Sequence, residues 1–476
     1  MRRPPHANLI LLGLIILLAL ALRIGWYTGP IGSDDNHYLV GAYEIYDGTY
    51  HPADNYWKTR YGMLLPIGAF DAIFGPGEFA GALWPMLCSL GAVVVCYFLG
   101  KLVLDEKTGL LAALLLAFYP LDIHYSGLIL PDIPLSFFMA ASVLTFLYAN
   151  KSERFAPLLF FLSGVLLAVA YSCRSMAVIL LPFFAIYVIF FEKKFKWLYA
   201  LFGAGFGIII LSECAYFLIE GLSPLHNFQL NAKAAIIVNS SGECSTSQAY
   251  YPLAIFQNLT VFGPYFFLFL PAMVLSVVKR QRGALIFLAW AGTILIILQF
   301  GFVSFFPPIP VVKVRKFLNF ATIPLILLAA WGLMRLSARI RWTVIIILVA
   351  VSIFLIWPYR YSANQTPEAL GGNMRAVCSY IRQLPPKPIY TDTRTIRMLR
   401  IISSFEMKPE QFHSLYDVSS PYELKDCYVI INKFYAQFDQ TNPHFKVPRF
   451  IAEYPYGLPE TWKGRDFFQS AVYEVP

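Results

Sequence analysis

Residues 8–27, NLILLGLIILLALALRIGWY, form an apolar run with a single charged side chain, Arg23. An apolar helix of about 20 residues crosses the ~30 Å hydrocarbon layer of a membrane. The sequence Met1-Arg2-Arg3 precedes the run, as at the start of a signal peptide. No small-residue cleavage site follows, so we interpret the run as a retained membrane helix.

Similar apolar runs recur along the first three quarters of the chain. They lie near residues 79–100, 108–126, 133–149, 156–173, 176–191, 197–218, 253–278, 283–303, 317–335 and 342–359. The composition is 58% hydrophobic and 14% charged, whereas soluble domains are about 45–50% apolar and about 25% charged. We therefore predict an α-helical polytopic membrane protein with about eleven transmembrane helices. A single soluble domain and a disordered chain are excluded.

The C-terminal part has an ordinary soluble composition. Residues 361–476 contain 25 charged side chains in 116 positions, twice the density of residues 1–360. We predict a transmembrane domain over 1–360 and a C-terminal α/β or α+β domain over 361–476. The patterns predict helices over 367–384 and 393–404 and strands over 388–391 and 427–432. Asp392 is interpreted as a helix cap, and Cys378 and Cys427 are candidates for a disulfide.

The basic residues predict the orientation of the chain. Lys and Arg are about twice as frequent in the short turns on the N-terminal side as in the opposite loops. Cytoplasmic loops carry such an excess. The N-terminus is therefore expected in the cytoplasm, and the C-terminal domain and loops 28–78 and 219–252 outside a cell (inner) membrane. The net charge of +9 then reflects topology and predicts no nucleic-acid partner.

An acidic motif follows the first apolar run: Ser33-Asp34-Asp35-Asn36-His37-Tyr38. Two adjacent carboxylates beside a membrane are unfavourable in free energy, which indicates a structural or functional role for them. One interpretation is that Ser33 or Asp34 caps a helix running through Tyr38. The other is that the carboxylates take part in catalysis, together with Asp132, which begins the fourth run.

Basic side chains on the outer side oppose the charge bias of the topology. Arg174 lies between two apolar runs, where it either extends to the membrane interface or binds a phosphate. Lys313, Arg315 and Lys316 precede the tenth run, where they either contact anionic lipid headgroups or bind a phosphate ligand.

Other ionisable residues are weaker candidates. His124 lies outside with His37 and His51, but no metal-ligand spacing accompanies them. We expect no cofactor, with a divalent metal as an open alternative. Glu213 is a candidate because ionisable residues inside membrane runs are often functional.

The order of these motifs resembles the C-type glycosyltransferase superfamily, in the branch of protein O-mannosyltransferases and lipid A aminoarabinose transferases. The resemblance covers roughly residues 8–190. It rests on the acidic pair with Tyr38, on Trp57-Lys58-Thr59-Arg60, on Asp132, on the pattern around Arg174, and later on 313–324. Asp35 replaces a usual Glu, and Arg60-Tyr61-Gly62 replaces a usual proline pair. Both departures leave the implied reaction class unchanged and affect only what the resemblance implies about the acceptor and the subfamily.

The resemblance implies an inverting hexosyl- or pentosyltransferase with a polyprenyl-phosphate sugar donor and an acceptor hydroxyl on protein, lipid or glycan. A phosphate departs as an anion, so the site needs cations and one base and no general acid. Asp34 is the candidate base, and Asp35 or Asp132 would orient the acceptor. The candidate phosphate ligands are Arg60, Arg174, Lys313, Arg315 and Lys316, with Lys58 beside them.

Two other functions compete with a transferase. A transporter would share the helices, but transporters commonly contain repeated halves with sites at the membrane midplane. Here no repeat is apparent and the ionisable residues gather at the outer surface. A non-catalytic scaffold for lipid-linked glycans would keep the fold and lack the base.

Overall fold

The structure is a computed structural model of the chain. It describes residues 5–27, 29–52, 55–240, 247, 249–257, 263–305, 308–359, 366, 369–436, 447–452, 454 and 458–476. Two compact units make up the chain, and each is described by itself. We call residues 1–27, 51–66 and 84–358 the helical unit, and residues 28–50, 67–83 and 359–476 the α/β unit.

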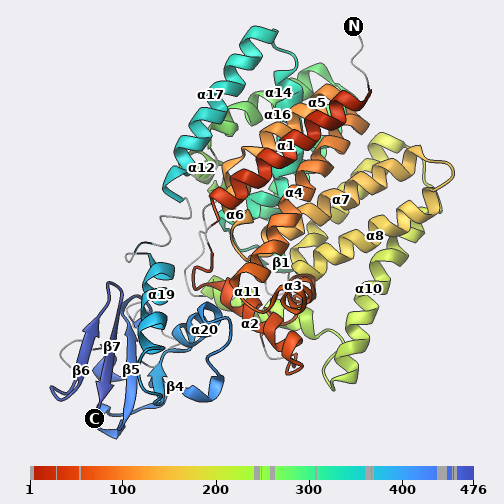
Figure 1. Ribbon diagram of the computed structural model, residues 1–476. Coiled ribbons are helices and arrows are strands. Elements are labelled where there is room, and N and C mark those ends of the chain that lie inside the picture. The colour runs from red at the N-terminus through yellow and green to blue at the C-terminus, as the bar shows by residue number, and fades with distance from the viewer. Residues whose placement is uncertain are drawn as a thin grey trace. The chain divides into compact units, whose positions relative to one another are not determined.

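The predicted apolar runs are helices (Figure 1). Among the described residues, nine helical segments are long and apolar enough to span a membrane. They are α1 (Pro5–Gly25), α4 (Glu78–Val103), α7 (Asp132–Lys151), α8 (Ala156–Cys173), Ser175–Glu192 (η1, α9 and η2), α10 (Tyr199–Ile219), α15 (Arg282–Phe300), Arg315–Leu333 (η4 and α16) and α17 (Ala338–Ile356).

Two predicted runs are less regular. The run 108–126 is a pair of helices, α5 (Glu106–Ala117) and α6 (Pro120–Ser126), bent by 57°. The run 253–278 corresponds to α12 (Tyr250–Gln257) and the shorter apolar helix Gly263–Lys279 (η3 and α14), and residues 258–262 lie outside the described residues. Within the predicted outer loop 28–78, residues 61–74 form helix α3 (Tyr61–Phe74).

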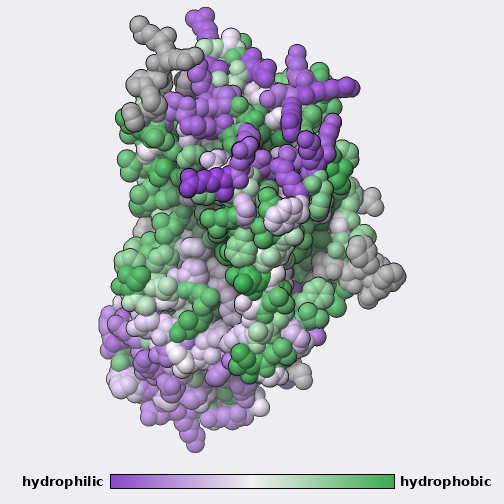
Figure 2. Space-filling model, turned by 90° about the vertical axis from the view of Figure 1, so that its right-hand side faces the viewer, coloured by the Kyte–Doolittle hydropathy of each residue, from purple (hydrophilic) through white to green (hydrophobic). Residues whose placement is uncertain are grey.

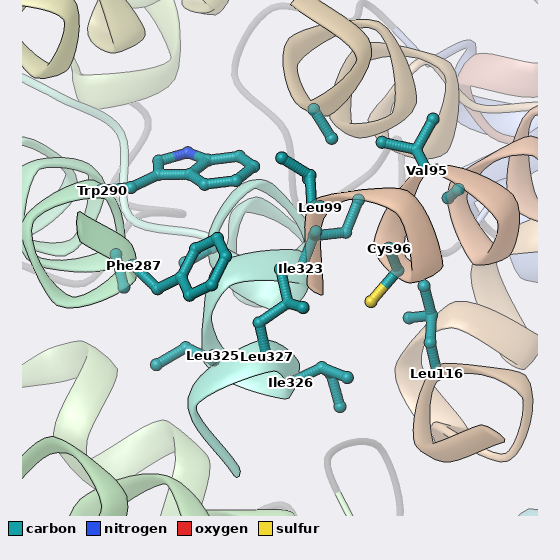
Figure 3. Packing of buried hydrophobic residues seen from close by; sticks show 14 of the residues in the cluster. Val95, Cys96, Leu99, Leu116, Phe287, Trp290, Ile323, Leu325, Ile326 and Leu327 are labelled. Atoms are coloured by element: carbon teal, nitrogen blue, oxygen red, sulfur yellow. The ribbon is translucent and has the colours of Figure 1, made fainter. Parts of the chain in front are cut away.

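The core of the helical unit lies around α16 (Asn319–Leu333). Apolar side chains of α4, α5, α15 and α16 interdigitate there, as Figure 3 shows for Leu99, Leu116, Trp290 and Ile326. The span that contains α16 is 89% buried within the protein, whereas α10 is only 11% buried. On the face shown in Figure 2, hydrophobic residues cover the side of the helices and hydrophilic residues gather at the upper end. This distribution is typical of a lipid-facing bundle.

A buried ion pair connects α1 to the bend between α5 and α6. Arg23 is fully buried, and its Nη2 lies 2.6 Å from Asp122 Oδ1. Pro120 has no N–H to donate to the carbonyl of Leu116, which accepts from Tyr119 N–H (3.2 Å). Arg23 also donates to the carbonyls of Leu116 (3.4 Å) and Ala117 (2.6 Å). Ser89 of α4 hydrogen-bonds to both charged groups.

This pair corrects one part of the sequence analysis. Arg23 was there the one charge within the apolar run 8–27, and Asp122 falls within the run 108–126, and neither was assigned a partner. Both lie inside the helical unit, where each neutralises the other and Arg23 satisfies the carbonyls freed by the bend. An unpaired charge in such surroundings is costly.

The α/β unit contains a five-stranded mixed sheet with the order β4-β3-β5-β7-β6. Strand β3 (Ile389–Thr391) is parallel to β4 (Phe412–Ser414) and β5 (Cys427–Asn432), whereas β7 (Ser470–Val475) is antiparallel to β5 and to β6 (Lys463–Asp466). Helices α19 (Leu370–Ile381) and α20 (Thr393–Ile402) complete this part, with the short α22 (Arg449–Ala452). Helix α2 (Asp34–Asp47), from far earlier in the sequence, packs against α20.

The sequence patterns of the C-terminal part are confirmed where the structure describes them. Both predicted helices and both predicted strands are present, except that residues 367 and 368 lie outside the described residues. Strand β5 is buried along its whole length because it packs on both faces: Tyr428 and Ile430 on one, Val429 and Ile431 on the other. Asp392 caps α20 by accepting from the N–H groups of Arg394 and Thr395. The disulfide between Cys378 and Cys427 is not formed, since both thiols are free.

Breaking the buried pair should destabilise the helical unit. We expect Asp122→Leu to lower the free energy of unfolding by about 3–5 kcal/mol, because Arg23 then remains buried without a counter-charge. The double variant Arg23→Met/Asp122→Leu should recover most of the loss. Thermal unfolding and size-exclusion profiles of the protein in detergent measure both.

The control is Glu106→Gln, which alters the exposed pair with Lys101 (2.9 Å). Exposed pairs contribute about 1 kcal/mol or less, so this variant should unfold near the wild-type temperature. An Asp122→Leu variant as stable as Glu106→Gln would show that the buried pair contributes nothing.

Candidate functional site

A buried carboxylate and an arginine meet at the ends of two helices of the helical unit. Asp132 is the first residue of α7 and is completely buried. Arg174 follows the last residue of α8 in extended backbone, and its Nη1 lies 3.5 Å from Asp132 Oδ1. The guanidinium also stacks over the ring of Phe317, 4.4 Å from the ring centroid, and the Arg174 side chain remains 15% exposed. Asp132 and Phe317 therefore hold the Arg174 guanidinium in place, and its exposed part can contact a ligand.

Arg60 belongs to the same region through a close backbone approach. A Cβ atom on Gly62 would lie 2.6 Å from the backbone nitrogen of Cys173, the residue before Arg174. Only glycine allows α3 and α8 to approach so closely. Arg60, two residues before Gly62, is almost completely buried, and its guanidinium lies over the ring of Tyr56 at 4.8 Å. Gly62 thus brings two arginine-bearing segments together.

The basic segment 313–316 is held in place by α12 and α15. Lys313 Nζ donates to the carbonyl of Ser247 (2.8 Å), and the Tyr251 hydroxyl donates to the carbonyl of Val314 (3.3 Å). Tyr251 N–H in turn donates to Gln299 Oε1 (3.1 Å). The segment continues into η4 (Arg315–Leu318), which supplies the Phe317 ring under Arg174. Arg315 is exposed, so its charge is available at this edge of the site.

Two acceptor oxygens at this site are buried without a hydrogen-bond donor among the described residues: Asp132 Oδ2 and Asn319 Oδ1. Ser136 lies one turn after Asp132 on α7, and its hydroxyl donates to the Asn319 carbonyl (2.8 Å). The two oxygens thus lie at the first residues of two neighbouring helices, α7 and α16. Leaving a buried acceptor unpaired costs about 1–3 kcal/mol. Such groups favour a ligand that brings hydroxyl donors.

The acidic motif lies in the α/β unit. Asp35 is completely buried, and both its oxygens accept backbone hydrogen bonds, from Ile31 N–H (2.5 Å) and Ser33 N–H (2.6 Å). Asp34, the first residue of α2, is partly exposed. Burial raises the pKa of Asp35 to about 6, against the opposing effect of the backbone N–H groups. Asp35 therefore holds the turn, and the more accessible carboxylate is that of Asp34.

The capping interpretation needs a correction. Ser33 does occupy the N-cap position of α2, but its side chain makes no capping hydrogen bond. The carboxylate of Asp35 instead reaches back to the N–H of Ser33. A carboxylate in the first turn of the helix thus satisfies N–H groups of the loop before α2 and not those of the helix itself.

The weaker candidates take structural positions. Glu213 Oε1 accepts from Asn227 Nδ2 (2.6 Å), and Asn227 Oδ1 accepts from the Thr59 hydroxyl (2.9 Å), which ties α10 and α11 (His226–Ser240) to the segment of Lys58 and Arg60. His124 packs edge-on against Tyr125 in α6. Among the described residues, no group of three His, Cys, Asp or Glu side chains is placed to hold a metal ion.

Two residues of this site were not among the sequence candidates. Asn319 and Phe317 belong to the quoted basic segment, but neither was assigned a role. The usable signal was polarity at Asn319, because a buried amide at the start of a very apolar helix is unusual. Phe317 carried no signal, since the run around it is rich in aromatic residues.

Known proteins share this fold. A family model described as dolichyl-phosphate-mannose-protein mannosyltransferase matches residues 64–217, which include Asp132 and Arg174. The structure of ArnT from Cupriavidus metallidurans bound to undecaprenyl phosphate superposes with a TM-score of 0.68 and 13% identity, over 99% of this chain and 98% of that chain. Comparison with curated protein sequences returns no match.

An archaeal enzyme is similar over much of its length. The Archaeoglobus fulgidus oligosaccharyltransferase in the apo form has a TM-score of 0.61 and 12% identity, over 97% of this chain and 73% of that chain. AglB from the same organism, in complex with an inhibitory peptide and a dolichol-phosphate, has a TM-score of 0.52 and 12% identity, over 98% and 74%. These matches confirm the multi-pass membrane fold and the resemblance inferred from sequence.

Filling the space at Gly62 should disturb the approach of Arg60 and Arg174. We expect Gly62→Ala to destabilise the protein by about 1–3 kcal/mol, because the added methyl group meets backbone atoms that cannot move aside. The matched control is Gly203→Ala in α10, where nothing lies within 4 Å of the added Cβ. Alanine favours a helix by up to about 1 kcal/mol over glycine, so the control should be neutral or stabilised. Equal thermal unfolding of the two variants would contradict the close approach.

The pKa of Asp35 predicts a pH-dependent contribution to stability. An ordinary Asp in the unfolded chain has a pKa of 3.8, and folding raises it to about 6. Asp35 therefore favours folding most below pH 3.8, and this contribution, about 3 kcal/mol for two pKa units, is lost as the pH rises through 6. Asp35→Asn removes the contribution and one of the two acceptors.

The measurement is the thermal unfolding of wild type and Asp35→Asn between pH 4 and pH 7. The variant should be most destabilised relative to wild type at pH 4, and the gap should narrow by pH 7. A gap that stays constant across this range would refute the raised pKa.

Proposed function

We propose that the protein is a membrane glycosyltransferase that moves a hexosyl or pentosyl group from a polyprenyl-phosphate donor to an acceptor hydroxyl. The observation that carries the proposal is the contact of Arg174 with the buried carboxylate of Asp132 (3.5 Å), with Phe317 of η4 under the guanidinium and Gly62 of α3 against Cys173. ArnT, whose fold extends over the whole chain, binds undecaprenyl phosphate. The same class of lipid suits this site.

The cations stabilise the departing phosphate. The acceptor oxygen forms a bond to the anomeric carbon while the bond from that carbon to the phosphate oxygen breaks, and its electron pair stays on the phosphate. Arg60 and Arg174 offer planar, permanently charged donors to phosphate oxygens. Lys313, Arg315 and Lys316 add positive charge along the basic segment. This charge lowers the barrier without a general acid.

The acceptor proton passes to a carboxylate. Asp34 suits this role because it is partly exposed, whereas both oxygens of Asp35 already accept backbone hydrogen bonds. Attack from the face opposite the phosphate inverts the anomeric carbon.

The sugar hydroxyls fit the unpaired acceptors of the helical unit. Asp132 Oδ2 and Asn319 Oδ1 lack donors among the described residues, and sugar hydroxyls supply them. Asp132 thereby orients the sugar and keeps Arg174 in position at 3.5 Å. This role differs from orienting the acceptor, which was the alternative considered from the sequence.

The proposed location follows from the distribution of basic residues. The N-terminus lies in the cytoplasm, and the C-terminal domain over 361–476 and the site lie on the outer side of a cell membrane. The acceptor is a protein, lipid or glycan hydroxyl on that side. A transporter is disfavoured because Asp132, Arg174 and the basic segment lie at the ends of helices. A non-catalytic scaffold differs from the transferase by needing no base.

Removing the base should abolish transfer. We expect Asp34→Asn to lower product formation about 10²–10⁴-fold, since a positioned general base contributes this much. The measurement is comparative mass spectrometry of surface glycolipids and glycoproteins in wild type, a deletion strain, and the deletion strain complemented at matched protein levels. A hexose- or pentose-sized mass missing from the deletion strain identifies the acceptor.

Asp392→Asn is the matched control, because Asn caps a helix as well as Asp does and α20 should be preserved. This variant should restore the missing mass. Full restoration by Asp34→Asn as well would reject a catalytic role for the acidic pair and favour the scaffold. No difference between wild type and the deletion strain would reject the transferase.

A further inference from the structure

The turn before Asp34 rests on a tyrosine of the C-terminal domain, more than 400 positions later in the sequence. The hydroxyl of Tyr435 donates to the carbonyl of Gly32 at 2.9 Å. Gly32 has a φ of +77°, and a Cβ atom there would lie 1.9 Å from the Tyr435 oxygen. The position thus requires glycine both for its backbone conformation and for the space that the tyrosine occupies. Both residues belong to the α/β unit.

This contact lies at the centre of the hydrogen bonds that hold the acidic pair. The residues on either side of Gly32, Ile31 and Ser33, donate their N–H groups to the two oxygens of Asp35. Tyr435 holds the carbonyl between them. The Gly32 carbonyl and the Ser33 N–H belong to one peptide group, so Tyr435 and Asp35 hold the same peptide group and, with it, the start of α2, where Asp34 lies.

Tyr435 is itself held firmly. It is 3% exposed, and its N–H donates to Asn432 Oδ1 (3.2 Å) at the end of the central strand β5. The guanidinium of Arg394 lies over its ring at 5.4 Å. Tyr435 therefore links the Gly32 turn to the end of strand β5, and the turn is held at a fixed place relative to the sheet.

The rest of α2 packs on the same domain. The ring of Tyr43 stacks on Phe405 with centroids 4.0 Å apart and an interplanar angle of 2°. His37 Nε2 lies 3.1 Å from Arg397 Nη1 of α20. These contacts hold α2 from His37 to Tyr43 against the domain. The position of its first residues, which include Asp34, therefore depends on the turn.

We propose that Tyr435 is a positioning residue: its hydroxyl holds the Gly32 turn so that Asp34 faces the acceptor, which makes the C-terminal domain a part of the catalytic apparatus. The proposal rests on the proposed function, in which Asp34 accepts the proton. A base displaced by about 1 Å loses much of its effect, whereas binding of the donor phosphate by the helical unit does not need this turn.

The test compares Tyr435→Phe with Tyr473→Phe in the full-length protein. Each variant loses one hydroxyl in the same domain, and the Tyr473 hydroxyl donates to Tyr454 (3.1 Å), not to the turn. Hydrogen–deuterium exchange of residues 29–40 in detergent reports the turn without requiring turnover. We expect exchange about tenfold faster in Tyr435→Phe and unchanged in Tyr473→Phe.

Turnover is measured in membranes of the complemented deletion strain. Lipid extract of the deletion strain supplies the unused donor, and mass spectrometry follows the product. Tyr435→Phe should lower kcat about 10–100-fold while the apparent KM for the extract changes by less than about twofold, because the variant misplaces the base and leaves donor binding intact. Tyr473→Phe should match wild type in both.

Three outcomes overturn the proposal. Exchange and kcat of Tyr435→Phe equal to those of Tyr473→Phe would show that the hydroxyl does not hold the turn. Faster exchange with unchanged kcat would show that the turn is held but not needed. No turnover by wild type would remove the proposed function itself, and the exchange data would then report only a structural contact.

Discussion

The ion pair between Arg23 and Asp122 is the constraint on which the helical unit depends. A bend between α5 and α6 frees backbone carbonyls inside a region without water, and a carboxylate is buried beside them. Arg23 compensates the charge of the carboxylate and also binds the carbonyls. Its five N–H donors reach Asp122, Ser89 and carbonyls of α1 and α5. Without it, the bend would expose unpaired polar groups to lipid. The position of α1 against α4 and α6 follows from this pair.

The bend matters because the segment after it carries the site. Helix α6 turns away from the direction of α5, and the chain then enters α7 at Asp132. Arg174 follows α8, and Phe317 follows the basic segment, so three separate segments present one side chain each at the same place. The helices thus position polar groups at their ends. This arrangement holds the charge of Arg174 between a carboxylate and an aromatic ring.

The sequence predicted what depends on length and periodicity. Apolar runs identified the spans, and helical and strand patterns in the C-terminal part identified α19, α20, β3 and β5. Strand β6 was not predicted because Lys463–Asp466 is exposed throughout and carries no alternation. The partner of Arg23 and the contact of Tyr435 with Gly32 could not be predicted either, since each joins residues far apart in the chain without a local signal. Which of Asp34 and Asp35 accepts the N–H groups of the loop could not be predicted either, because two adjacent identical residues do not encode the loop geometry.

The burial of α16 has a consequence for how the protein is made. This helix packs against α5, α7, α14 and α15, and the span that contains it is 89% enclosed by protein. Among the described spans, only α17 follows it in the chain. The helices that surround α16 therefore enter the membrane before the helix that lies between them. The middle of the bundle is thus filled after the helices around it.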